Sequence, residues 1–264
     1  MNLKHLFDLA LMFLIPFLAV MIPIIIGQWY GIYHSKKFPG LADAPIGTVV
    51  GAAFGLLAFM VAFVFQISSN RYDTRKALLL EEITNIRTTY LRAELLEEPM
   101  SSETRNLLAE YVDIRAGIGK DTAKLNHLIY RSQQILDTLW SYSVKLAEED
   151  RSSEIYALFT TSVNDLVDNY NQRITMTFEY RIPSVVLWII LIIAFCAMLA
   201  LGYQFGISGR GNLGIIMLLA VMFSVVMFLI LSLDRPETGL AKLNQKPLIT
   251  LQKQLQVMQS NRNK

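Results

Sequence analysis

The chain has 264 residues, 53% of them hydrophobic, and its mean hydropathy of +0.38 is too high for an ordinary soluble domain. The formal net charge is only +2, and no segment is basic enough to suggest nucleic-acid binding. The single cysteine, Cys196, lies in an apolar run, which excludes a disulfide framework and predicts a small buried side chain. These properties indicate a membrane protein, and the helical patterns along the chain, described below, predict that it is an all-α membrane protein.

Four apolar runs predict four transmembrane helices, because each is long enough for the ~20 residues that cross the hydrocarbon. The first is also longer than the apolar core of a signal peptide, so we expect it to be retained. The runs divide the chain into residues 1–69 (first and second helices), 70–180 (a helical domain), 181–233 (third and fourth helices) and 234–264 (a tail). The helices are expected at about Leu6 to Trp29, within Asp43 to Glu98, at Ile182 to Gly209 and at Gly211 to Leu233.

The second helix is predicted to leave the membrane and continue in water. Asp43 is a plausible N-cap and Pro45 fits the first turn. The segment from Ala44 to Asn70 carries no charge, and no proline or glycine follows until Pro99. Nothing in the sequence therefore ends this helix at the membrane surface.

Within this helix, Gly47, Gly51 and Gly55 are four residues apart, and Phe59 and Phe63 follow at the same spacing. One interpretation is a packing seam, since small residues let helices approach closely in lipid. The other is a pore wall, in which the two phenylalanines form a hydrophobic constriction. Polar side chains suited to a cytoplasmic mouth come next, namely Gln66, Ser68, Ser69, Asn70 and Arg71.

The middle domain is predicted to be entirely helical. Its best periodic signal is a three-four repeat from Leu125 to Leu146, which requires a coiled-coil-like neighbour. Pairs of carboxylates such as Glu81 and Glu82 are interpreted as solvated helix faces. An acidic helical domain with such a repeat could also bind a cytoplasmic partner.

The basic residues near the ends of the spans predict the orientation. Nine lie on one side and three on the other, which predicts that both termini and the middle domain lie in the cytoplasm. The membrane is expected to be the inner (plasma) membrane of the cell. The nine are Lys4, Arg71, Arg75, Lys76, Arg173, Arg181, Arg235, Lys242 and Lys246, against Lys36, Lys37 and Arg210.

No motif in the chain predicts an enzyme. His5, His34 and His127 are far apart in sequence, so we expect no catalytic residues, no metal site and no cofactor. The spans lack ionisable residues apart from Asp8 near one end, which counts against a proton-coupled transporter.

Two blocks resemble the bestrophin-like family of bacterial membrane proteins. The first is Asn70 to Leu96 with Leu107 to Arg115, and the second is Leu233 to Gly239 followed by Lys246 to Leu248. True bestrophins, which the layout resembles more distantly, are pentameric ion channels with four spans per subunit. Their pore is lined by the second span and has an apolar neck.

This resemblance implies an oligomeric ion channel, with a pentamer favoured. Phe59 and Phe63 would form the pore constriction, Gly47, Gly51 and Gly55 would line the pore or pack helices, and Gln66, Ser69, Asn70 and Arg71 would form the mouth. The implied partners are membrane lipid, further copies of the chain and a permeant small ion, with no nucleic acid. The alternative is a membrane-anchored helical scaffold or sensor.

Overall fold

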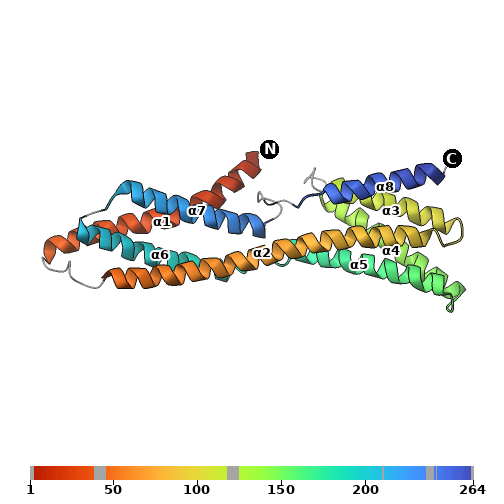
Figure 1. Ribbon diagram of the computed structural model, residues 1–264, viewed down its shortest axis with the longest axis horizontal. Coiled ribbons are helices and arrows are strands. Elements are labelled where there is room, and N and C mark those ends of the chain that lie inside the picture. The colour runs from red at the N-terminus through yellow and green to blue at the C-terminus, as the bar shows by residue number, and fades with distance from the viewer. Residues whose placement is uncertain are drawn as a thin grey trace. The chain divides into compact units, whose positions relative to one another are not determined.

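The computed structural model describes residues 3–38, 46–117, 125–209, 211–235, 241 and 243–262. Every regular element in these ranges is a helix (Figure 1). The chain divides into two compact units, which we call the membrane unit (residues 1–73 and 180–242) and the head unit (residues 74–179 and 243–264). The helix α2 (Ile46–Ala93) contributes to both.

The membrane unit contains α1 (Leu3–Lys37), the first part of α2, α6 (Ser184–Ser208) and α7 (Leu213–Asp234). All four helices are long and apolar enough to cross a membrane. The predicted fold class is confirmed, including the continuation of the second helix past Asn70. The expected N-cap Asp43 and first-turn Pro45 lie outside the described residues.

Many large apolar side chains of the membrane unit are exposed, which suits a surface surrounded by lipid because hydrocarbon solvates them well. Trp188 and Leu218, for example, are 65% and 61% exposed. Cys196 is exposed as well. The expectation of a buried thiol was therefore wrong, since an apolar residue within a membrane span need not face the protein interior.

The tightest packing in the membrane unit joins α1 to α6 through four glycines, Gly27 and Gly31 on α1 with Gly202 and Gly206 on α6. We call these residues the glycine seam. A Cβ on Gly202 would lie 2.1 Å from the carbonyl oxygen of Ile24, and one on Gly27 would lie 2.2 Å from that of Leu199. The two backbones are therefore in direct contact, as in other small-residue helix pairs in lipid.

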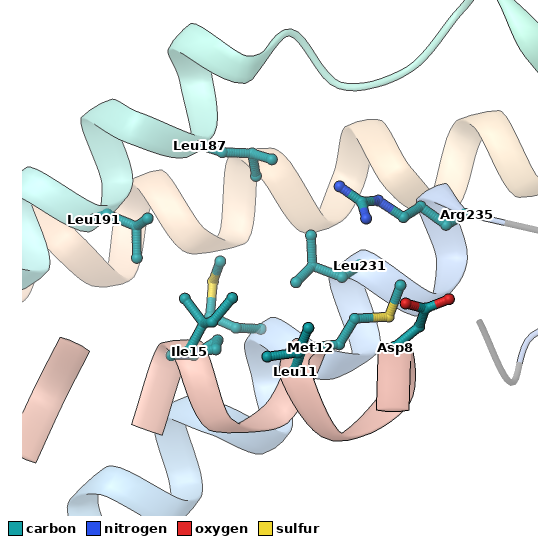
Figure 2. Close-up of a pocket in the computed structure, with 10 residues that line it drawn as sticks. Asp8, Leu11, Met12, Ile15, Leu187, Leu191, Leu231 and Arg235 are labelled. Atoms are coloured by element: carbon teal, nitrogen blue, oxygen red, sulfur yellow. The ribbon is translucent and has the colours of Figure 1, made fainter. Parts of the chain in front are cut away.

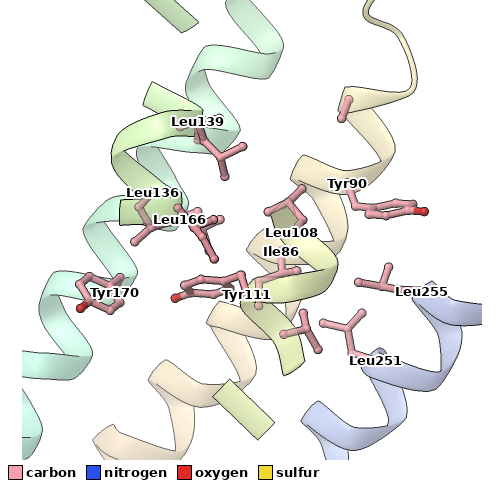
Figure 3. Packing of buried hydrophobic residues seen from close by; sticks show 14 of the residues in the cluster. Ile86, Tyr90, Leu108, Tyr111, Leu136, Leu139, Leu166, Tyr170, Leu251 and Leu255 are labelled. Atoms are coloured by element: carbon pink, nitrogen blue, oxygen red, sulfur yellow. The ribbon is translucent and has the colours of Figure 1, made fainter. Parts of the chain in front are cut away.

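The head unit contains the rest of α2, α3 (Met100–Gly117), α4 (Leu125–Glu149), α5 (Glu154–Phe178) and α8 (Lys246–Arg262). Figure 3 shows side chains from all five helices converging in one core. The repeat on α4 buries Ile135, Leu139 and Leu146 there, so the neighbours that it requires lie in the same chain. The helix α8 lies within the predicted tail and packs against α3 with Leu248, Leu251 and Leu255.

We predict that Gly202→Ala destabilises the membrane unit by about 1–3 kcal/mol, the usual cost of overpacking a tight contact. The added Cβ would force α1 and α6 apart, because the atom that it meets is a backbone oxygen. Thermal unfolding in detergent measures the effect. Gly51→Ala is the control, since a Cβ there meets no atom of the described ranges within 4 Å. Equal melting temperatures for the two variants would contradict the claim that the glycine seam stabilises the membrane unit.

Candidate functional site

The helix α2 has one buried face and one exposed face along its length. Val50, Leu57 and Val64 recur every seven residues on the buried face. At 3.6 residues per turn, a seven-residue step is close to two full turns, so these three side chains share one face. Ser68 is buried as well, and the part of α2 in the head unit has its own buried residues, Arg75, Glu82, Ile86 and Ala93 among them.

The opposite side of α2 carries most of the predicted site residues. We call it the open face and define it by Gly51, Gly55, Phe59, Phe63, Gln66 and Asn70, all of which are exposed. Phe59 is 67% and Phe63 is 54% exposed. Only 17% of the apolar window of α2 is buried, against 28–33% in the other three spans. The chain thus leaves α2 the least covered of its membrane helices.

Among the residues that the structure describes, the glycines of α2 form no packing seam. A Cβ on Gly51 or Gly55 would meet none of their atoms within 4 Å, and one on Gly47 would meet only the side-chain nitrogen of Gln204 at 3.1 Å. The two interpretations of this pattern, helix packing and pore lining, therefore both require a second copy of the chain.

Two of the predicted mouth residues lie on the open face. The side-chain amide of Gln66 donates a hydrogen bond to the side-chain oxygen of Asn70 at 2.7 Å. Ser69 is half-buried. Ser68 is fully buried on the opposite face, so it does not belong to the polar collar.

Arg71, the fourth predicted mouth residue, turns away from the open face and pairs with Asp234 at the end of α7. The two side chains are 3.3 Å apart, and the carboxylate is only 4% exposed. The Asp234 oxygens also accept from the backbone N–H of Ile182, at 3.1 and 3.3 Å. One carboxylate thus joins α2, the segment before α6 and the end of α7.

The head unit holds a second buried carboxylate, Glu82, which the sequence analysis wrongly interpreted as part of a solvated face. Tyr111 on α3 donates to its Oε1 at 2.8 Å. Arg115, also on α3, lies 2.9 Å from the same oxygen, and Arg173 on α5 pairs with the other. We call these four residues the Glu82 cluster. Its neighbour Glu81 is exposed.

Burial shifts the pKa of two members of the Glu82 cluster. It raises the pKa of Tyr111 to about 12, so the hydroxyl keeps its proton and can donate. It lowers the pKa of Arg173 to about 10, which still leaves the guanidinium charged at neutral pH. Arg115 also stacks over the rings of Tyr111 and Tyr170. These pKa shifts belong to a structural ion-pair network, because the carboxylate is enclosed by its own donors.

No group of three or more histidine, cysteine, aspartate or glutamate side chains is placed to hold a metal ion within the described ranges. His34 contacts the hydroxyl of Tyr203 through Nδ1 at 2.9 Å and stacks on Tyr30. The open face of α2 is therefore a candidate functional site, and two buried charge clusters position the helix.

Comparisons with known proteins point to one family. The family model described as the Bestrophin-like domain matches residues 19–248. Two crystal structures of variants of a bacterial bestrophin homolog from Klebsiella pneumoniae are similar to this chain, with TM-scores of 0.66 and 0.61 at 18% and 19% identity, each covering 96% of this chain and 99% of the other. A structure described as a membrane protein has a TM-score of 0.62 at 18% identity and covers 95% and 98%. No curated protein matches the chain.

We predict that Asp234→Ala lowers the stability of the membrane unit by about 1.5–3 kcal/mol, the usual contribution of a charge-assisted hydrogen bond. Asp234→Asn should cost less, because an amide oxygen can still accept from the N–H of Ile182. Thermal unfolding in detergent and hydrogen exchange at the start of α6 measure both effects. Asp73→Ala, at an exposed carboxylate on α2, is the control. An Asp234→Ala variant that melts like the wild type would refute this role.

We also predict that Glu82→Gln destabilises the head unit by about 3–5 kcal/mol, because it leaves two buried guanidinium groups without their carboxylate. Amide hydrogen exchange in α3 and α5 of the full-length protein should become correspondingly faster. The adjacent substitution Glu81→Gln removes the same charge from an exposed position and should change little. Equal exchange in the two variants would show that the Glu82 cluster does not hold the core together.

Proposed function

The chain belongs to the Bestrophin-like family, and on that basis we propose that it is an oligomeric ion channel with a pore lined by α2. The observation that carries the proposal is the open face of α2. A helix face in a membrane protein that its own chain does not cover must meet either lipid or further copies of the chain. If several copies turn this face toward a common axis, the faces together enclose a conduit.

The order of residues on the open face suits a conduit better than a lipid contact. Gly51 and Gly55 carry no side chains and leave space beside the helix. Phe59 and Phe63 project one turn apart and would narrow the conduit into an apolar neck, a known device for gating by dewetting. The amides of Gln66 and Asn70 follow on the same face, where they could contact water and a permeant small ion.

We favour a pentamer of chains in the inner (plasma) membrane, with both termini and the head unit in the cytoplasm. The basic residues near the ends of the spans support this orientation, nine on one side against three on the other. Lipid and further copies of the chain would then be the partners of the membrane unit.

We predict that the purified oligomer passes current in planar bilayers, and that Phe59→Ala and Phe63→Ala each increase the current severalfold. Removing an aromatic ring would widen the neck and make it easier to wet. Phe195→Ala is the matched control, because Phe195 is 44% exposed on α6 and should face lipid. Its current should equal that of the wild type.

Two outcomes would overturn the channel proposal. The first is a folded oligomer that passes no current under any ionic gradient. The second is an equal response of current to Phe63→Ala and Phe195→Ala, since the open face would then have no special part in conduction. A monomer or a closely packed dimer without a central channel would instead favour a membrane-anchored scaffold.

A further inference from the structure

The membrane unit contains a cavity of about 390 Å³ between α1, α6 and α7 (Figure 2). This volume falls in the range of about 300–1,000 Å³ that is usual for small-molecule sites. Most of the lining is aliphatic, so the body of any occupant must be apolar. The lining includes Leu11, Met12, Ile15, Leu187, Leu191 and Leu231.

Two ionisable side chains, Asp8 on α1 and Arg235 after α7, also line the cavity. Figure 2 shows both at the same end of it. Asp8 is half-buried and Arg235 is exposed. Among the residues that the structure describes, no side-chain hydrogen bond or ion pair engages either group. The cavity thus presents one negative and one positive group beside an apolar interior.

The two charges lie where the apolar segments end. Asp8 is the last charged residue before a run from Leu9 to Ser35 without Asp, Glu, Lys or Arg. Arg235 directly follows α7, whose residues from Leu213 to Leu233 carry no charge. Side chains at such positions lie at the level of the lipid head groups, while the apolar part of the cavity lies at the level of the acyl chains.

The combination of charges selects among lipids. A lipid head group whose only charge is the phosphate, such as that of phosphatidylglycerol, would suit Arg235 but would bring a second negative charge close to Asp8. A choline head carries a positive charge but has no N–H to donate to a carboxylate. A primary ammonium and a phosphate on the same head group satisfy both side chains with charge-assisted hydrogen bonds.

We propose that this cavity, defined by Asp8, Arg235 and the aliphatic lining, is a binding site for a phospholipid with an ethanolamine head group. The ammonium would donate to the Asp8 carboxylate, the phosphate would accept from the Arg235 guanidinium, and one acyl chain would occupy the space beside Leu187 and Leu191. The inference does not depend on conduction, so it can fail while the channel proposal stands.

Native mass spectrometry of the full-length protein in a neutral detergent tests the proposal. The probes are phosphatidylethanolamine, phosphatidylglycerol and phosphatidylcholine with identical acyl chains. We expect wild-type protein to bind the ethanolamine lipid about tenfold more tightly than the other two, the effect of one charge-assisted hydrogen bond. Binding measured in this way requires no current.

Three substitutions separate the parts of the site. Asp8→Asn should remove the preference for ethanolamine over choline, and Arg235→Gln should weaken the binding of all three phospholipids. Leu191→Trp should displace the acyl chain and so reduce the binding of all three. Asp73→Asn, the same charge change at an exposed position on α2, should leave binding unchanged. Asp8→Asn and Asp73→Asn keep the size of the side chain, Arg235→Gln shortens it but keeps it polar, and the melting temperatures of all variants verify folding.

The proposal is overturned if wild-type protein binds the three lipids equally, if Asp8→Asn leaves the preference for ethanolamine over choline intact, or if Arg235→Gln leaves the binding of all three lipids unchanged. It is also overturned if Leu191→Trp changes the size of the oligomer without changing the lipid bound. That result would assign the cavity to a contact between copies of the chain.

Discussion

The constant pitch of α2 governs the candidate site. Because an unbroken helix keeps 3.6 residues per turn, the side chains that α2 buries within the membrane unit fall on one face and the open face lies opposite to them. Val50, Leu57 and Val64 lie on this buried face. The open face is therefore a consequence of packing elsewhere along the same helix, and local sequence near Phe59 does not decide it alone.

Two buried carboxylates fix the rotation of α2 about its axis. Asp234 holds Arg71 in the membrane unit, and Glu82 is itself a residue of α2 held from α3 and α5. Buried ion pairs contribute little net stability compared with apolar packing, but breaking one is costly. Their contribution here is geometric. A shift of α2 by a single residue would rotate the charges of Arg71 and Glu82 away from their partners, and this would cost more free energy than the mispacking of most apolar side chains.

The four spans, the long second helix and the periodic helix α4 could be predicted because each depends on signals local in sequence: apolar length, the absence of proline and glycine, and a three-four repeat. The glycine seam could not, since Gly27 and Gly202 each have small neighbours four residues away but nothing local identifies the matching helix. Glu82 was missed for the same reason, because its partners Arg115 and Arg173 are distant in sequence. For the open face, the spacing of Gly51 to Phe63 places these residues on one side of the helix, but nothing local in the sequence indicates which surface they meet.

The glycines of this membrane unit differ in how freely the chain can replace them. In the seam, any side chain at Gly27 or Gly202 would clash with a backbone oxygen, so these two positions do not tolerate substitution. A homologous chain with larger residues there must hold α1 and α6 further apart. At Gly51 and Gly55 the described part of the chain leaves space for larger side chains. If homologous chains keep glycine at these two positions, contacts with other molecules, and not packing within the protomer, must require it.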